Sequence, residues 1–446
     1  MVKPFIGFKS LEDYEKNVII SICKKDSTLF GKVYIDDILI CEKSLHIAPL
    51  DDVRAGKVLV YDMASLITGK TLPWGTLTGI RPVSYMNWCK NEYGDEYGLK
   101  VFKENCRVRE DKVQLCKTID FYEHEIIEKL KEKHLVYVHI PFCETRCSYC
   151  SFSVMTMDKF GKWMDKYVPA LISEIEFTYN ALPPENAIAA YIGGGTPSTL
   201  SLSDTDRLLN TLNEKFPNLI EITFEAGRPE SITDELMKVL VKNKVTRISI
   251  NPQSMVQETL DNIGRKHRVE DIYKAFQIAK KFPVEINMDM ITGLVGEGAD
   301  EVAYTLSEIL KLAPDNVTIH SLAVKSGSRF RNDNVLFNYD ELIDRNKLYS
   351  SLYEKGYHPY YLYRQKRQLG EAENVGFAKP NKENIFNILS MNDLNHVLAF
   401  GMGAVTKYVD SNLDCHRVFG YRDIICYLDR LDELCNKKIE EALNLM

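Results

Sequence analysis

Short runs of β-branched and other apolar residues alternate with longer amphipathic segments from residue 135 onward. Apolar runs of about four to eight residues are typical of buried strands, and apolar positions three or four residues apart are typical of helices. Strands that alternate with helices pair in parallel, so the pattern predicts a parallel sheet covered by helices. The predicted strands are 135–140, 187–193, 219–225, 246–251, 284–290 and 316–322, and the helices between them are 164–182, 202–215, 234–242, 269–282 and 300–312.

These six strands predict an α/β fold built on a partial (β/α)6 barrel of the TIM type, because a full barrel needs eight such units. Residues 1–130 mix β-prone pieces, a turn-rich segment at 72–82 and a helical stretch at 113–133, which indicates an N-terminal mixed α+β domain. The alternation ends near residue 330. We therefore expect three domains, at 1–130, 131–330 and 331–446, the last being an α+β domain on the substrate side.

Net charge and hydropathy limit the partners and the cellular location that we expect for this chain. The chain has 446 residues, is 45% hydrophobic and carries a formal net charge of −7. Nucleic-acid surfaces need clustered Lys and Arg, so we expect no nucleic-acid partner. No stretch of about 18 apolar residues is present, and the amino terminus shows no long apolar run after Lys3. A cytoplasmic protein without a membrane span is expected.

Three of the eleven cysteines stand apart from the rest. Eight are scattered at spacings that match neither a disulfide framework nor a zinc pattern, and we expect most of them, such as Cys23, Cys41 and Cys426, to be reduced and buried. The other three form a C-x3-C-x2-C motif directly after the first predicted strand. They are Cys143, Cys147 and Cys150.

Three thiols match the needs of a four-iron cluster that leaves one iron open. Each iron takes one ligand besides its sulfides, usually a thiolate. An open iron can chelate the amino and carboxylate groups of S-adenosylmethionine (SAM) and pass an electron into its sulfonium. Zinc usually needs four ligands, and no paired C-x2-C or H-x3-H follows. Spacing alone leaves three chance core cysteines as the alternative, but barrel enzymes place reactive groups at this end of their strands.

Residues after the later strands are suited to ligand binding. Consecutive glycines at 193–195 let a ligand approach the backbone closely, although a plain tight turn has the same composition. Glu225 ends the third strand, where a carboxylate can accept a hydrogen bond from a ribose or an amino group. Tyr137 and Tyr149 flank the cysteines and offer aromatic faces to adenine or methionine, with ordinary core packing as the alternative.

The motif, with an aromatic residue before its last cysteine and in the context Tyr137-Val-His-Ile-Pro-Phe-Cys143, resembles the radical SAM superfamily and its oxygen-independent coproporphyrinogen III oxidase (dehydrogenase) family. The resemblance covers most of the chain. Segments 72–82, 360–366 and 373–380, and Ile250-Asn-Pro-Gln253, look like the HemZ-type branch. It implies a [4Fe–4S] cluster and SAM as cofactors, and it implies SAM contacts at Gly194, Gly195, Thr196, Glu225, Gln253, Arg265, Asp289 and Ala323.

The resemblance implies haem biosynthesis, in which two propionates of coproporphyrinogen III are oxidatively decarboxylated to vinyls to give protoporphyrinogen IX. It implies an electron donor such as a flavodoxin or ferredoxin, and we expect a monomer. The substrate carries four carboxylates, so cationic groups should line its pocket. Arg364, Lys366 and Arg367 are candidates, and solvated surface residues are the alternative for them.

One departure from the family keeps a second function open. The oxidases carry a fourth cysteine two residues after the third, where this chain has Phe152; Val295, where proline is common, is a smaller difference. The haem-chaperone branch, whose members hand over haem, also lacks that cysteine. The long region before the cysteines argues for the dehydrogenase. A tRNA-modifying or methyl-transferring radical enzyme is disfavoured by the negative net charge.

Overall fold

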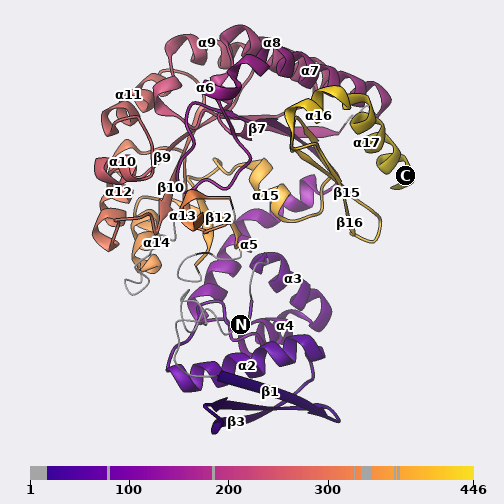
Figure 1. The fold of residues 1–446 in the computed structure, drawn as a ribbon, viewed down its shortest axis with the longest axis vertical. Helices are drawn as coiled ribbons and strands as arrows, with labels where there is room; N and C mark the ends of the chain where they lie inside the picture. Colours follow the sequence, from indigo (N-terminus) through magenta and orange to yellow (C-terminus); the bar gives the residue numbers. More distant parts are fainter. Residues whose placement is uncertain are drawn as a thin grey trace. The chain divides into compact units, whose positions relative to one another are not determined.

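The computed structural model describes residues 18–77, 81–182, 186–325, 327–332, 343–365, 368 and 372–445. The chain divides into two compact units, which are Met1–Phe121 with Leu362–Glu373, and Tyr122–Tyr361 with Asn374–Met446 (Figure 1). Within the described segments, no helix is both long and apolar enough to cross a membrane.

The first unit contains a three-stranded antiparallel sheet packed on helix α2. In β2 every second residue is buried, so one face of the sheet is directed at the helix. Gly31 allows this close packing, because a Cβ there would lie 2.7 Å from Met63 Cε. The elements are β1 (Val18–Lys25), β2 (Thr28–Ile35), β3 (Ile38–His46), α2 (Asp52–Thr68), α3 (Pro82–Tyr93), α4 (Asp95–Lys100), the π-helix η2 (Val101–Asn105) and α5 (Glu110–Leu130).

Six parallel strands form the centre of the second unit, in the order β4-β7-β8-β9-β10-β11. Their order in space follows their order along the chain, as in a barrel. Every strand predicted from the sequence overlaps one of them, and the predicted partial barrel is confirmed. The strands are β4 (His134–Ile140), β7 (Ala187–Gly194), β8 (Glu221–Glu225), β9 (Arg247–Gln253), β10 (Glu285–Thr292) and β11 (Asn316–Ser321).

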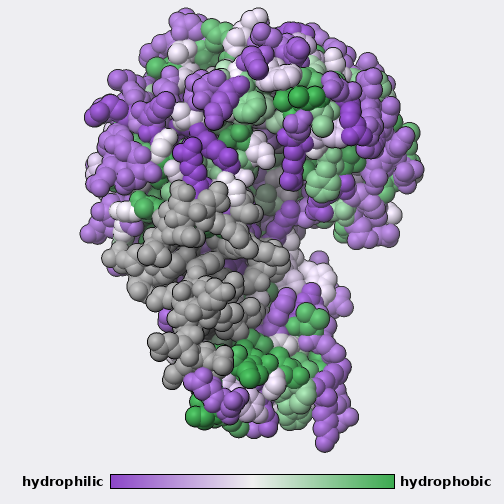
Figure 2. All heavy atoms as spheres, in the orientation of Figure 1, coloured by the Kyte–Doolittle hydropathy of each residue, from purple (hydrophilic) through white to green (hydrophobic). Residues whose placement is uncertain are grey.

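The crossover helices form an outer arc around these strands (Figure 1). Hydrophilic residues dominate the outer surface of the arc, with hydrophobic ones scattered among them (Figure 2). Side-chain caps fix where helices begin: the hydroxyl of Ser201 accepts from Asp204 N, and that of Thr233 from Leu236 N. The helices are α7 (Met164–Ala181), α8 (Leu202–Lys215), α9 (Asp234–Lys242), α10 (Gln257–Asn262), α11 (Val269–Ala279) and α12 (Ala299–Leu312).

Strands from the carboxyl-terminal part of the chain extend the same sheet to eleven strands. β14 pairs in parallel with β4, and β13 pairs antiparallel with β11. The domain boundaries near 130 and 330 stay predictions, but the region after 330 adds strands to the barrel sheet. Its elements are α13 (Arg329–Asn332), α14 (Arg345–Glu354), β12 (His358–Tyr363), β13 (Asn374–Ala378), α15 (Ile385–Met391), β14 (Val397–Phe400), β15 (Val405–Val409), β16 (Cys415–Phe419), α16 (Ile424–Asp429) and α17 (Leu431–Leu445).

Helix α15 lies against the inner face of β4 and β7 (Figure 1). Its Phe386 ring lies 6.3 Å from the ring of Tyr137 and 5.2 Å from that of Tyr191, centroid to centroid. The carboxylate of Glu221, the first residue of β8, accepts hydrogen bonds from Ile385 N at 3.0 Å and Phe386 N at 2.9 Å. Protein therefore fills the barrel interior near the amino ends of the strands.

The scattered cysteines follow the expectation only in part. All eleven are free thiols, and five of the eight outside the motif are buried. The expected burial is wrong for Cys23 and Cys426, which are exposed. Cys23 lies on β1, where Ile20 packs on the core, so the strand's alternation directs residue 23 outward.

Candidate active site

The cysteine loop follows β4 at the carboxyl end of the barrel. Cys143 ends the short strand β5 (Phe142–Cys143), which pairs with β6 (Met155–Thr156) and ties the two ends of the loop together. Cys143 and Cys147 are buried, and Cys150 is half-buried. The three thiols thus lie in one loop, whose two ends are held together by the β5–β6 pairing.

The loop after β7 packs directly on the cysteine loop. Gly195 N donates to Ile140 O, and Thr196 N donates to Phe142 O, both at 2.7 Å. A Cβ at Gly195 would lie 2.5 Å from Phe142 O, so only glycine permits this approach. The Thr196 hydroxyl oxygen lies 3.3 Å from Cys143 Sγ. Gly194, Gly195 and Thr196 are therefore adjacent to the first cysteine, as a shared cofactor site requires.

Two buried guanidinium groups surround Cys147. Arg228 donates from Nη2 to Cys147 Sγ at 3.5 Å and to the Thr145 carbonyl at 2.7 Å. Burial alone would raise the pKa of the Cys147 thiol, but the charges of Arg265 and Arg228 outweigh it and lower that pKa. Burial raises the pKa of Cys143 to about 11. The second cysteine is thus the one whose thiolate the protein stabilises most.

Arg265 joins the cysteine loop to two strand ends. Its Nη1 donates to the carbonyls of Asn251 at 2.6 Å and Gly227 at 3.3 Å, and its Nη2 donates to the Tyr149 hydroxyl at 3.4 Å. An arginine taken alone is more often a salt-bridged surface residue. The residue is instead buried, and its contacts are with backbone carbonyls and a tyrosine of the cysteine loop.

Glu225 and Asp289 are two carboxylates near enough to each other for the charge of one to act on the other. Burial and the charge of Asp289 raise the pKa of Glu225 to about 8, although Asn251 donates to it at 3.2 Å. Burial would also raise the pKa of Asp289, but His320, at 3.7 Å, and Asn287 hold it below its ordinary value. Glu225 is therefore largely neutral near pH 7, and Asp289 is charged.

Gln253 and Ala323 lie at the ends of β9 and β11. Gln253 is buried in a left-handed conformation with φ of 66°, beside a register shift between β9 and β10, and its Oε1 has no hydrogen-bond partner in the described part of the chain. Ala323 is half-buried two residues after β11. Tyr137 is half-buried within β4, next to Tyr191. Their roles toward SAM stay predictions.

Several buried polar atoms at these strand ends lack partners among the described residues. They are His139 Nε2, Arg228 Nη1, Gln253 Oε1 and Arg265 Nε. Buried donors and acceptors without partners are costly, so they indicate a polar ligand. SAM carries amino, carboxylate and ribose groups that can satisfy both donors and acceptors. The residues present therefore fit SAM next to the thiols.

The described residues contain no group of three or more His, Cys, Asp or Glu side chains that converges on a single metal ion. In a four-iron cluster each thiolate binds a different iron, so its three thiols need not converge. The donor set, three free thiols next to two guanidinium groups, is suited to a cluster whose thiolates carry negative charge. Cys143, Cys147 and Cys150 would hold it.

Sequence reasoning missed Arg228 and His139. His139 is half-buried on β4 with its Nε2 buried, and desolvation lowers its pKa to about 4, so it is neutral. Both residues lie in motifs that the sequence displays, Glu225-Ala-Gly-Arg228 and Tyr137-Val-His139. Their position at strand ends was the available signal, but it did not tell which strand-end residues reach the thiols.

Of the three candidate substrate cations, the structure describes Arg364 alone. Arg364 is buried in the first unit, where its guanidinium donates to the carbonyls of Leu77 and Ala372 and covers the Trp74 ring. It thus has a structural place. Lys366 and Arg367 lie outside the described residues. Phe152 is 63% exposed, and Val295 is half-buried.

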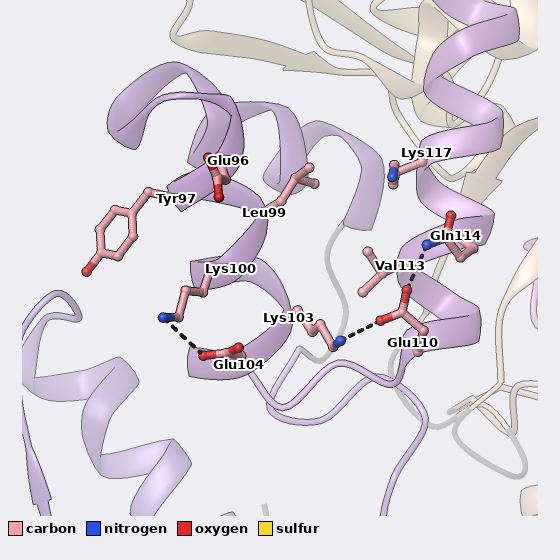
Figure 3. A pocket seen from close by; sticks show the side chains of 10 residues that line it. All are labelled: Glu96, Tyr97, Leu99, Lys100, Lys103, Glu104, Glu110, Val113, Gln114 and Lys117. Atoms are coloured by element: carbon pink, nitrogen blue, oxygen red, sulfur yellow. Dashed lines mark hydrogen bonds and ion pairs between the residues drawn. The ribbon is translucent and has the colours of Figure 1, made fainter.

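A groove of about 570 Å³ in the first unit differs from the barrel site, because charged side chains that line it form ion pairs with each other. Figure 3 shows charged side chains from α4, η2 and α5 around it. Lys103 pairs with Glu110 at 2.6 Å, and Lys100 with Glu104 at 3.9 Å. These charges already have partners, so the groove does not share the unmet polar atoms of the barrel site.

Comparisons with known proteins agree with this geometry. The radical SAM superfamily model matches residues 137–309, which include the cysteine loop and β4 to β10. The oxygen-independent coproporphyrinogen-III oxidase-like protein HemZ of Bacillus subtilis (strain 168) is 33% identical over 388 residues, which is 84% of this chain and 77% of that relative. Heme chaperone HemW of Lactococcus lactis subsp. lactis (strain IL1403) is 34% identical over 206 residues, covering 46% of this chain and 52% of that protein.

The fold has a solved counterpart. Coproporphyrinogen III oxidase (HemN) from Escherichia coli, a radical SAM enzyme, superposes with a TM-score of 0.55 at 21% identity, over 70% of this chain and 72% of that chain. Members of the superfamily bind a [4Fe–4S] cluster and SAM. Because the HemZ relative matches 84% of this chain, the likeness extends well beyond the shared cysteine motif. The chain therefore belongs to the HemZ-type branch of the oxygen-independent coproporphyrinogen III oxidase family, within the radical SAM superfamily.

Proposed function

We propose that this protein is an oxygen-independent coproporphyrinogen III dehydrogenase, which converts two propionates of coproporphyrinogen III into vinyls and yields protoporphyrinogen IX. The observation that carries the proposal is the match to the oxidase-like relative, which spans 84% of the chain. Two heme chaperone HemW relatives match less of the chain, 46% for that of Lactococcus lactis and 64% for that of Bacillus subtilis.

The protein's own residues would bind and orient the cofactors. Cys143, Cys147 and Cys150 would hold the cluster, and Arg228 and Arg265 would offset its negative charge. When bound, the cluster and SAM supply the radical chemistry that removes hydrogen from the substrate. The carboxyl ends of the strands would exclude water, since most of the residues there are buried.

Glu225 and Asp289 would hold SAM through complementary protonation states. A neutral Glu225 can donate a hydrogen bond as well as accept one, whereas the charged Asp289 favours a cationic or donor group. Thr196 would keep Cys143 in place through its hydroxyl contact. Each of these is a binding or positioning role.

We also propose a small electron carrier such as a flavodoxin or ferredoxin as electron donor, and a monomeric protein. The decarboxylation releases electrons from the substrate, so an acceptor is required as well. Size measurement of the anaerobically purified full chain checks the monomer.

Anaerobic product analysis tests the activity. The reconstituted full chain is incubated with coproporphyrinogen III, SAM and a reductant, and carbon dioxide and vinyl products are measured. We expect protoporphyrinogen IX, with a monovinyl intermediate at early times. A chain that carries its cluster and cleaves SAM but forms no vinyl product would refute the proposal. A Cys147→Ser variant is the matched control and should form no product.

The second candidate function is haem binding and transfer. It is favoured by Phe152, which stands where the oxidases carry a fourth cysteine, and by the similarity to heme chaperone HemW over 206 residues. Stoichiometric haem uptake and delivery to an apo-haemoprotein, without turnover of coproporphyrinogen III, would support this function instead.

A further inference from the structure

Two cations next to the cysteine loop have no acidic partner among the described residues. Arg146 lies between Cys143 and Cys147, and Lys325 lies four residues after the end of β11. Both are therefore at the carboxyl end of the barrel. Neither belongs to the set of residues expected to contact SAM.

The segment that carries Lys325 is fastened to the cysteine loop. Arg146 Nη2 donates to Gly327 O at 2.7 Å, and Phe330 N donates to Ser148 O at 3.3 Å. Ser328 closes the turn by donating from its amide and its hydroxyl to Lys325 O. The Arg146 guanidinium thus contacts the backbone two residues from Lys325.

Both side chains are partly removed from water, and neither has a carboxylate partner among the described residues. Arg146 is half-buried, and its Nε is buried without a hydrogen-bond partner in the described part of the chain. Lys325 is half-buried, and burial lowers its pKa with no nearby charge to offset the effect. Partly buried cations without an anion are unfavourable, so they indicate an anionic ligand. The guanidinium fork and the ammonium group are both suited to a carboxylate.

We propose that Arg146 and Lys325 form a binding site for a propionate carboxylate of a tetrapyrrole. The inference deepens the proposed function, because it takes from it the tetrapyrrole as ligand. It assigns to Arg146 and Lys325 the carboxylate-binding role that the sequence suggested for Arg364, Lys366 and Arg367. Coproporphyrinogen III and haem both carry propionates, so the site serves either of the two candidate functions.

Binding of coproporphyrin III, the stable oxidised form of the substrate, tests the site directly. The anaerobically reconstituted full chain is titrated, and porphyrin fluorescence reports the affinity. We expect Lys325→Met and Arg146→Gln each to weaken binding about tenfold, since each removes one charge-assisted contact. Lys325→Arg keeps the charge and should bind as the unaltered protein does.

Three controls show whether a loss of affinity comes from the carboxylate contact itself. Lys274→Met removes an exposed lysine on the outer helix α11 and should change nothing. The tetramethyl ester of coproporphyrin III has no free carboxylate, so Lys325→Met should leave its affinity unchanged. Iron content shows whether each variant still loads the cluster. Unchanged coproporphyrin III affinity in Lys325→Met, or an equal loss for the ester, would overturn the proposal.

A SAM titration of the same variants distinguishes the two sources of a carboxylate. We expect SAM affinity to stay the same in Lys325→Met. A loss of SAM affinity with unchanged porphyrin affinity would overturn the assignment to the tetrapyrrole. Binding is measured without turnover, so absence of vinyl product would refute the dehydrogenase function and leave this site standing.

Discussion

Buried arginines have carboxylate partners at one end of the barrel and lack them, among the described residues, at the other. At the amino ends of the strands, Arg247 of β9 pairs with Glu285 at 2.5 Å and Glu221 at 3.4 Å, and it donates to the carbonyls of Lys382 and Glu383. At the carboxyl ends, Arg228 and Arg265 are equally buried but have no carboxylate within ion-pair distance among the described residues.

We infer from this difference that the buried charge at the amino ends stabilises the fold, whereas the buried charge at the carboxyl ends binds a ligand. A buried cation is tolerated when acids and carbonyls satisfy it, as they do for Arg247, whose Nε is its one atom without a partner in the described chain. At the carboxyl end the partners are thiols and a few carbonyls, and several donors are left over. We therefore expect substitutions at the amino end to affect stability, and those at the carboxyl end to affect cofactor binding.

The largest effect is expected for Cys147→Ser. Removing this thiolate should abolish stable cluster loading, because three thiolates are already the minimum for a cluster with one open iron. Iron and labile-sulfide content and the visible absorption of the anaerobic protein measure it. Cys426→Ser, at an exposed thiol outside the motif, is the control and should load iron as the unaltered chain does. Full loading of the Cys147 variant would contradict the assignment.

Arg247→Met should destabilise the fold by about 3–5 kcal/mol, because it leaves Glu221 buried without its cation. Denaturant unfolding of the apo-protein measures the free energy. SAM affinity, measured at a temperature where the variant is folded, should change little. A large loss of SAM affinity with unaltered stability would contradict the expectation that substitutions at the amino end affect stability and not cofactor binding.

Arg265→Met is the matched substitution at the carboxyl end. It should weaken SAM binding by roughly 1.5–3 kcal/mol, the range for a hydrogen bond to a charged group, while it alters the free energy of unfolding less than Arg247→Met does. Titration of SAM into the anaerobic holo-protein measures the affinity. Equal stability losses for the two arginine variants would remove the distinction between the ends.

Glu225→Gln should change how the free energy of unfolding depends on pH. The pKa of Glu225 is raised to about 8, so the unfolded chain loses this proton at lower pH than the folded chain does. The contribution of Glu225 to stability is therefore complete at acid pH and declines as pH rises from near 4.5 through 8. Glutamine should remove this decline, which is at most about 1.4 kcal/mol per pH unit. Unfolding free energies measured across that range would show parallel slopes if Glu225 did not titrate there.

Arg228→Gln is expected to have the smallest effect. Loss of the guanidinium next to Cys147 should lower the reduction potential of the bound cluster by roughly 40 mV, if the contact contributes about 1 kcal/mol to the reduced state. Spectroscopic redox titration measures the potential. Arg228→Lys, which keeps a cation there, should recover part of the shift. A potential unchanged in both variants would mean that Arg228 acts only through its bonds to Thr145.

Much of the second unit could be predicted because its signals are local. The strand at 135–140 and the helix at 202–215 agree with β4 and α8 within one residue, since apolar periodicity and the Ser201 cap act within a few residues. The carboxyl-terminal strands could not be placed. Val397–Phe400 is a short apolar run like many others, and only pairing with β4 gives it a position in the barrel sheet.

The sequence by itself determined the three-thiol motif, the order of strands and helices, and the family, because each depends on neighbouring residues or on matching segments. Only the tertiary structure decided which cations lie next to Cys147, why Glu225 is largely neutral near pH 7, and that Arg364 serves the first unit. These properties depend on distances between residues far apart along the chain. Such distances are fixed only when the strands pair and bring their carboxyl ends together.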